Sequence, residues 1–484
     1  MSLNGLEPKN LWKHFDKIRS IPHCSGQEAK LAEYLIAYAK GKGLDFEQDK
    51  TGNVVIRVPA SPGREGAPTV VLQGHMDMVG EKNSDVVHDF SKDPIQLEFQ
   101  GEWLKAKGTT LGSDNGIGLA AALAIIDSKE VVHGPLELLF TVDEEVGLTG
   151  AGKLKSGFVK GNMLMNLDSE ELGAVYIGCS GGGDNTLKHP IGFLDAPAGT
   201  KGFVLRVTGL RGGHSGIDIH EQRGNAIKIL ARCLWKASRT QPMHLAGLKG
   251  GNKRNAIPRE AEAELMVLET AVDDLSALVG DEAAKIAGEL GGREVNLGVR
   301  LEPSERSFVR VMEGKSQKSL LNLLLALPHG VETMSYDIPG LVETSNNLAT
   351  IATGGNEVVI GLSTRSSVAS ALKALRERIR STAELAGASV EENDPYPGWK
   401  PNLDSKLLAV VKAVHLREFG VEPKMKAIHA GLECGIIGEK FPGMEMISFG
   451  PTMRNPHSPE EHVHIGSVGK FWTFLTAALD GLSS

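Results

Sequence analysis

Short apolar runs that end in, or lead to, a histidine or an acidic residue constrain the fold of this chain more than any other feature. Four such runs are TVVLQGH (69–75), LELLFTVDE (136–144), NMLMNLD (162–168) and MEMISFG (444–450), and a helical segment, 117–128, lies between the first two. Strands that alternate with helices are typical of a layered α/β domain. Because ligands bind at the carboxyl ends of strands in open α/β sheets, these polar residues are candidates for one shared site.

The pattern of predicted strands and helices changes in the middle of the chain. Residues 260–269 (EAEAELMVLE) alternate as a half-buried strand does, and NEVVIGLSTR (356–365) runs directly into a helix over 367–385. Since 484 residues exceed what one core usually supports, we expect an α/β domain formed by 1–185 and 398–484. It would be a mixed sheet flanked by helices, interrupted by an inserted α+β domain over 186–397.

Composition and charge exclude several classes of partner. The net charge is -8, with 52 basic against 60 acidic residues and no dense Lys/Arg run, so a nucleic-acid partner is not expected. The sequence contains no run of about 18 uncharged apolar residues, so a membrane span is not expected. The amino terminus resembles no targeting signal, and four scattered cysteines suit a reducing compartment, so we expect a cytoplasmic protein. The cysteines are Cys24, Cys179, Cys233 and Cys434.

The polar residues at the strand ends fit a metal site. His75 and Asp77 are two residues apart, so their side chains would share one side of a strand. Each candidate has an ordinary explanation, such as a salt-bridged core histidine or an acidic residue in the first turn of a helix. Their recurrence favours function, because several carboxylates buried around two imidazoles need cations. The other candidates are Asp114 in GSDNGIG, Glu144 and Glu145 in VDEEVG, Asp168 in NLDSEE, and His457 in NPHSPEE.

Two histidines and several carboxylates suit a pair of divalent ions that share a bridging carboxylate. Zinc accepts such nitrogen and oxygen ligands, and manganese or cobalt could replace it. A paired site can activate water and polarise a carbonyl, while a remaining carboxylate acts as general base. Glu144 and Glu145 could divide these tasks, and their spacing does not say which is which.

Five motifs together resemble a known family. HMD, GSDNG, DEEVG, NLDSE and PHSPEE, in this order and interrupted by a large insertion, resemble the co-catalytic zinc exopeptidases, which include carboxypeptidase G, tripeptidase and carnosine dipeptidases. IPHCSGQEAKLAEY, HDFSKDPI, RNAIPRE, YPGWKPN and HAGLECG are similar to bacterial dipeptidases within that family. The resemblance covers almost the whole chain and implies a zinc-exopeptidase-like mixed sheet with a large inserted lid domain.

The resemblance also implies a role for each candidate. His75 and Asp168 would bind one ion and Glu145 and His457 the other, with Asp114 bridging them. Glu144 would be the general base, Asp77 would orient His75, and the peptide bond from Asp114 to Asn115 would be cis. Asp168 favours the dipeptidases, because relatives that deacylate amino acids tend to have Glu there.

In the insertion, the resemblance assigns His214 of GGHSG to the developing oxyanion. Arg365, with Asn255, would bind the substrate's carboxylate. GGHS as a plain turn and Arg365 paired with a surface acid are the ordinary alternatives.

The implied activity is hydrolysis of unblocked dipeptides, including Xaa-His dipeptides such as carnosine, by a two-metal-bound hydroxide with Glu144 as base. An N-acyl amino acid amidohydrolase is the alternative, since it would keep every metal ligand. A non-catalytic binding protein would require the loss of a ligand or the base, and all are present. A small peptide is the expected partner. The insertion is about twice what a one-sheet lid needs, so it could supply in one chain what smaller relatives obtain by pairing, and a homodimer through it is possible.

Overall fold

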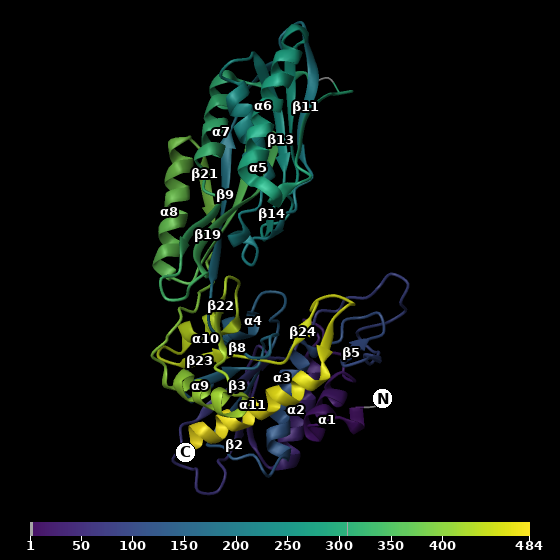
Figure 1. Ribbon diagram of the computed structural model, residues 1–484, viewed down its shortest axis with the longest axis vertical. Coiled ribbons are helices and arrows are strands. Elements are labelled where there is room, and N and C mark those ends of the chain that lie inside the picture. The colour runs from purple at the N-terminus through teal and green to yellow at the C-terminus, as the bar shows by residue number, and fades with distance from the viewer. Residues whose placement is uncertain (1–2, 307) are drawn as a thin grey trace. The chain divides into compact units, whose positions relative to one another are not determined.

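A computed structural model describes residues 3–306 and 308–484, which form two compact units (Figure 1). Unit 1 contains the described residues up to Cys179 together with Trp399–Ala427 and Leu432–Ser484. Unit 2 contains Ser180–Gly398 and Ile428–Gly431. No helix within the described ranges has the length and apolar character needed to cross a bilayer.

The main sheet of unit 1 is mixed, as the strand and helix pattern predicts, and the predicted α/β fold class is confirmed. Four neighbouring strands, β6, β3, β7 and β23, run parallel, and the strands that flank them, β2 and β8, are antiparallel to their neighbours. The carboxyl ends of the four parallel strands therefore meet at one edge. In sheet order the strands are β1 (Asp45–Gln48), β2 (Val54–Val58), β6 (Leu136–Thr141), β3 (Val70–His75), β7 (Met163–Asn166), β23 (Glu445–Ser448), β8 (Ala174–Cys179) and β22 (Lys424–Ile428).

The parallel strands are apolar because both faces of the sheet are covered. Every residue of β3, β6 and β7 is buried, which explains why these runs are continuously hydrophobic rather than alternating. Helices α3, α9 and α2 pack on β3, β23 and β2 respectively. The helices are α1 (Lys9–Ile18), α2 (Ala29–Lys42), α3 (Ser113–Asp127), α4 (Thr149–Lys153), α9 (Lys406–Phe419), α10 (Glu433–Lys440) and α11 (Ile465–Ser483), and a small second sheet has the order β24 (Met453–Arg454), β25 (His462–His464), β5 (Trp103–Ala106), β4 (Leu97–Gln100).

The start of α2 differs from the sequence pattern. Ser25 followed by Glu28 predicts a capping box, but the helix begins without a side-chain cap. Ser25 donates to the carboxylate of Asp77 at 2.8 Å, and Glu28 accepts from the backbone N–H of Asp143 at 3.0 Å. Both side chains thus form hydrogen bonds at the edge of the sheet where the candidate site residues lie, and neither is free to cap the helix.

Unit 2 is built on an antiparallel sheet with one helical face. Residues of helices α5, α6, α7 and α8 join the inner face of the sheet in one hydrophobic cluster. The strands are β16 (Gly298–Pro303), β11 (Thr200–Thr208), β15 (Ala261–Leu268), β13 (Met243–Gly250), β19 (Val342–Gly354), β20 (Glu357–Ser366), β9 (Gly181–Pro190) and β21 (Ser389–Glu392), with β18 (Gly330–Met334) also on β19, and the helices are α5 (Ala226–Ala237), α6 (Val272–Leu290), α7 (Gly314–Ala326) and α8 (Ala369–Leu385). Two short pairs complete the unit, β10 (Phe193–Asp195) with β17 (Arg310–Met312) and β12 (Gly213–His214) with β14 (Ala256–Ile257).

This sheet consists of two halves that meet at a narrow seam. β16, β11, β15 and β13 form one half, and β19, β20, β9 and β21 form the other. Across the seam, β13 and β19 pair at Lys249 with Ala352 and Gly250 with Ile351. Within the second half, β19 and β20 pair along most of their length. Helices α5 and α6 pack on strands of the first half, α7 contacts β13 of that half together with α5, and α8 packs on β9, β20 and β21 of the second half.

The turn after β6 depends on a close approach at Gly150. A Cβ atom on Gly150 would lie 2.4 Å from the carbonyl oxygen of Val142 and 2.5 Å from the side-chain oxygen of Asn53. We therefore expect Gly150→Ala to lower the free energy of unfolding by about 1–3 kcal/mol, because backbone atoms must move. Gly41→Ala, at an exposed position of α2 with open space around it, should instead raise that free energy by about 0.5–1 kcal/mol.

Urea denaturation of both variants measures the two free energies. If both substitutions changed the free energy of unfolding equally, the turn would accommodate the added methyl group, and the predicted steric conflict would be wrong.

Candidate metal centre

The candidate residues of unit 1 gather where the parallel strands end. His75 is the last residue of β3, Glu144 and Glu145 follow β6, and Asp168 follows β7 by two residues. Asp114 lies in the turn that begins α3, and its peptide bond to Asn115 is cis. The loop after β23 leads to His457 in a left-handed conformation, with φ of 59°.

His75 faces two carboxylates with one nitrogen and a carbonyl with the other. Its Nδ1 lies 2.9 Å from the backbone oxygen of Asp77. Because a carbonyl only accepts, Nδ1 carries the hydrogen and the Nε2 lone pair is left free. Nε2 lies 3.1 Å from Oδ1 of Asp114 and 3.2 Å from Oδ1 of Asp168. Three lone-pair atoms in such proximity repel one another unless a proton or a metal cation lies between them.

His457 forms a second group of the same kind. Its Nε2 lies 3.3 Å from Oδ2 of Asp114 and 3.0 Å from Oε2 of Glu145. Hydrogen bonds to these two carboxylates raise the pKa of His457 to about 11. Asp114 thus directs one oxygen toward each histidine, which is the arrangement of a bridging ligand.

The side chains present fit divalent cations. Within His75, Asp114 and Asp168, and within Asp114, Glu145 and His457, one ligand atom per residue lies within 4.8 Å of the others. Oε1 of Glu145 is buried without a hydrogen-bond partner. Burial also raises the pKa of Asp168 to about 6, so this carboxylate is costly to ionise without a nearby positive charge. Imidazole and carboxylate ligands of this kind suit zinc, manganese or cobalt.

Glu144 is a further carboxyl group of this cluster that resists ionisation. Burial raises its pKa well above the ordinary value, and the neighbouring carboxylates Asp168, Glu433 and Glu145 add to that shift. One oxygen of Glu144 also groups with ligand atoms of His75 and Glu145. A buried carboxylate beside a metal site is suited to exchange protons with a substrate or water.

Asp77 organises more of the site than its spacing from His75 indicates. Its carboxylate Oδ1 lies 3.5 Å from Nδ1 of His75, farther than its own backbone oxygen. The carboxylate also accepts the backbone N–H groups of Glu144 at 2.9 Å and Glu145 at 3.1 Å. Although burial opposes ionisation, His75, the N–H of Glu144 and the hydroxyl of Ser25 lower the pKa of Asp77 to about 2. Asp77 therefore fixes the turn that presents both glutamates.

Asn115 is a further site residue that the sequence reasoning did not single out. Its side-chain amide donates to Oδ1 of Asp168 and to the backbone oxygen of Leu167, both at 2.7 Å. The amide fits in a space bounded by glycines, because a Cβ on Gly74 or Gly118 would lie 2.2 or 2.5 Å from its oxygen. The only available signal was its place after Asp114 in GSDNGIG.

A fully buried polar row lies beneath the ligands. The side chain of Gln73 accepts from Asn166 at 2.6 Å, and Ser448 donates to Asn166 at 2.5 Å. Glu433 accepts from Gln73 and, at 2.9 Å, from Thr141, and burial raises its pKa to about 7. Gln73 and Asn166 stand two residues before His75 and Asp168 on their strands, so the row braces the strand ends that carry these ligands.

In unit 2, His214 has the geometry of a neutral donor. Its Nδ1 accepts the backbone N–H groups of Gly216 at 3.2 Å and Ile217 at 3.0 Å. Burial and the positive charge of Arg365 lower its pKa. With Nδ1 accepting, the hydrogen of the neutral ring lies on Nε2, which is then free to donate outward.

Arg365 is buried with unmet hydrogen-bonding capacity. One terminal nitrogen donates to the hydroxyl of Tyr396 at 3.0 Å, while its Nε is buried without a partner. Within the described residues no ion pair to Arg365 is found, so the alternative of pairing with a surface acid is not seen. His429 bonds to Ser345 at 2.7 Å nearby in the same unit. Asn255 is exposed and holds the His214 turn through its backbone oxygen, which accepts from Ser215 at 2.9 Å.

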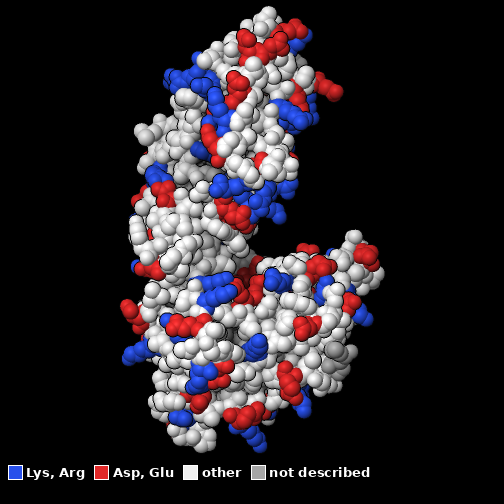
Figure 2. Space-filling view, viewed as in Figure 1, with Lys and Arg blue, Asp and Glu red and all other residues white. Residues whose placement is uncertain are grey.

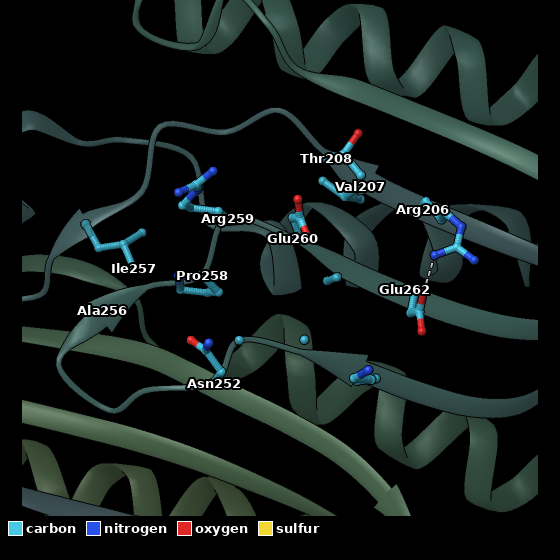
Figure 3. A pocket seen from close by; sticks show the side chains of 14 residues that line it. Arg206, Val207, Thr208, Asn252, Ala256, Ile257, Pro258, Arg259, Glu260 and Glu262 are labelled. Carbon is cyan, nitrogen blue, oxygen red and sulfur yellow. Dashed lines mark hydrogen bonds and ion pairs between the residues drawn. The ribbon is translucent and has the colours of Figure 1, made fainter. Parts of the chain in front are cut away.

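An open cavity of about 590 Å³ also lies in unit 2, at the ends of β11, β13 and β15 (Figure 3). Arg206 and Glu262 pair at its wall, and none of the predicted catalytic or substrate-binding residues lines it. On the face drawn in Figure 2, acidic and basic side chains are interspersed over both units. This cavity therefore adds nothing to the candidate site at the carboxyl edge of the unit 1 sheet.

A mixed α/β sheet that gathers two histidines and several carboxylates at its carboxyl edge defines the class of metal-dependent hydrolases. This chain belongs to the peptidase family M20/M25/M40, whose profile matches residues 71–480. The resemblance found in the motifs is thereby confirmed, and the chain is a peptide hydrolase.

Two relatives cover nearly the full chain. It is 45% identical over 477 residues to the cytosol non-specific dipeptidase of Escherichia coli, covering 99% of this chain and 98% of the relative. It is similar to the crystal structure of aminoacylhistidine dipeptidase from Vibrio alginolyticus, with a TM-score of 0.94, 44% identity and coverage of 99% and 98%. The aminopeptidase PepT of Bacillus cereus shares the fold, with a TM-score of 0.57 and 16% identity over 99% and 100% of the chains.

The buried carboxylates predict that divalent cations stabilise unit 1. An ion that binds only the folded state at 100 times its dissociation constant adds about 2.7 kcal/mol, so Mn²⁺ or Zn²⁺ should raise the Tm of chelator-treated protein by several degrees. Asp114→Asn removes the shared charge and should abolish most of that rise. Calorimetry with and without added ion measures both effects, and an unchanged Tm of the wild-type protein would contradict the assignment.

Proposed function

We propose that this chain is a metal-dependent dipeptidase that hydrolyses unblocked dipeptides, including Xaa-His dipeptides such as carnosine. The observation that carries the proposal is that Asp114 directs one carboxylate oxygen to each of two histidines. The names of the two full-length relatives support the substrate class.

In this proposal the two groups of ligands hold two divalent ions, most simply zinc. His75 and Asp168 would hold one, Glu145 and His457 would hold the other, and Asp114 would be shared between them. When bound, the ions polarise the scissile carbonyl and make water acidic enough to attack it near neutral pH.

Glu144 then acts as the general base. Its carboxylate takes a proton from the attacking water and returns that proton to the leaving amine, which is the shuttle that peptide hydrolysis needs. The turn is held by Asp77 through the backbone N–H groups of Glu144 and Glu145. The backbone that carries the base is therefore held in place before a substrate binds.

Unit 2 would supply two further groups as a lid. His214 offers Nε2–H to the oxyanion, which its accepting Nδ1 supports. Arg365 offers a buried guanidinium to the substrate's carboxylate, with Asn255 beside it, and the Nε without a partner supports this role.

A homodimer through unit 2 and a cytoplasmic location also remain predictions. Light scattering in solution tests the predicted homodimer.

The N-acyl amino acid amidohydrolase alternative is not favoured, because the two full-length relatives are named dipeptidases. Such an enzyme would use the same ligands and differ in the pocket for the amino end of the substrate. The experiment below therefore includes a blocked substrate.

Chelator-treated protein reloaded with zinc, manganese or cobalt should cleave β-Ala-His, Gly-His and Ala-Leu but not N-acetyl-His or a tripeptide. Glu144→Gln should lower kcat by about 100- to 10,000-fold, since it removes the proton shuttle, while the Tm rise on adding metal persists. Cleavage of N-acetyl-His alone would assign the chain to the deacylases. Retained activity of the Glu144 variant would contradict its role as base.

Arg365→Gln should raise KM for Ala-Leu more than it lowers kcat. Loss of a charged hydrogen bond costs about 1.5–3 kcal/mol, so kcat/KM should fall by about 10- to 100-fold. The same variant should act on Ala-Leu amide as the wild type does, because that substrate has no carboxylate to bind. Arg378→Gln, which breaks an exposed pair with Glu332 in the same unit, is the matched control, and equal effects of the two variants would contradict the proposed contact.

A further inference from the structure

Glu461 is a buried carboxylate whose bonds all go to one turn. Its side chain is 2% exposed. One oxygen accepts the backbone N–H groups of Leu111 at 2.7 Å and Gly112 at 3.0 Å. The other accepts the backbone N–H of Ser113 at 2.8 Å, its hydroxyl at 2.6 Å, and the backbone N–H of Asp114 at 3.2 Å. Five donors thus converge on a single carboxylate.

The turn that Glu461 holds presents the shared ligand. Asp114 is the residue that approaches both His75 and His457. Glu461 itself lies four residues after His457, and its backbone N–H closes the intervening turn by donating to Ser458 at 2.9 Å. Glu461 therefore ties the loop that carries His457 to the turn that carries Asp114, although these segments are more than 340 residues apart in the sequence.

A carboxylate is needed to satisfy this set of donors. Its two oxygens offer about four lone-pair positions, whereas a glutamine would offer one oxygen and turn an N–H group toward other N–H groups. The turn also begins α3, where the helix dipole favours a negative charge. A role as an ordinary helix cap would explain why Glu461 stabilises the protein. It would not explain why the cap comes from the loop that carries His457, a candidate metal ligand.

We propose that Glu461 is a positioning residue that sets the distance between the two ion sites. By holding the Asp114 turn against the His457 loop, it allows the two oxygens of Asp114 to serve two ions at once. The proposal rests on the two-ion centre proposed above. Without the clamp, Asp114 would still serve the His75 group, and the group formed with His457 and Glu145 would lose its shared ligand.

The test compares Glu461→Gln with Glu460→Gln. Glu460 is the adjacent residue of the same type, exposed and paired with Lys105 at 2.7 Å, so its substitution changes charge and composition equally without touching the turn. Equilibrium dialysis against Mn²⁺ counts the bound ions and gives their affinities. Electron paramagnetic resonance distinguishes an exchange-coupled pair of Mn²⁺ ions from isolated ones.

Wild type and Glu460→Gln should bind two ions with a coupled signal. Glu461→Gln should keep the first ion and bind the second about 10- to 100-fold more weakly, the usual cost of losing a residue that orients a ligand. Its signal should be that of isolated ions, and its kcat should fall while KM for Ala-Leu is retained.

If Glu461→Gln retains a coupled pair with wild-type affinity while its Tm falls, Glu461 only stabilises the turn and the proposal is wrong. Should that variant not fold, Glu461→Asp keeps the charge on a side chain one methylene shorter. It should also weaken the second ion, and an unchanged pair in Glu461→Asp would overturn the proposal. A wild-type protein that binds fewer than two ions would overturn the two-ion centre and this inference together.

Discussion

The cost of burying like charges is the constraint on which unit 1 depends. Asp114, Glu145 and Asp168 approach two imidazoles at the end of a sheet whose strand β3 is buried throughout. Such a group is stable only if cations, protons or hydrogen-bond donors compensate for the lost water. In each group an imidazole Nε2 faces two carboxylate oxygens, and a cation between these atoms would compensate for the lost water.

A second group of carboxylates makes this arrangement rigid. Asp77, Glu461 and Glu28 do not face the imidazole gaps with their oxygens but accept backbone N–H groups of the turns that carry the ligands. Each converts a flexible turn into a fixed one at the expense of a further buried negative charge. Unit 1 therefore contains more acidic groups at this edge than the proposed ligands alone, and cations bound to the inner group would also favour the ionised state of the outer group.

The sequence predicted the parts of the site that are local and missed the parts that are not. His75 and Asp77 are adjacent on a strand, so their proximity follows from the period of a β-strand. The partner of the Asp114 turn, Glu461, and the partner of Gln73, Glu433, come from distant segments, and no spacing in the sequence indicates them. The capping box at α2 was wrong for the same reason, because tertiary contacts of Ser25 and Glu28 replaced the local ones. In unit 2, the sequence pattern did not predict helices α6 and α7. Each helix buries only a narrow apolar face, and most of its other residues are not buried.

The two units offer opposite chemistry to a ligand. Unit 1 gathers negative charge around sites for cations, whereas unit 2 holds a buried guanidinium and a neutral imidazole donor at Arg365 and His214. A lone buried guanidinium is unfavourable in the same way as a lone buried carboxylate, and it is stabilised by an anion rather than a cation. In the proposed reaction, a dipeptide with a free carboxylate would supply that anion, and its hydrolysis would develop a second negative charge at the scissile carbonyl oxygen. The neutral state of His214 would then matter, because an Nε2–H donor would stabilise that oxygen without competing with Arg365 for the carboxylate.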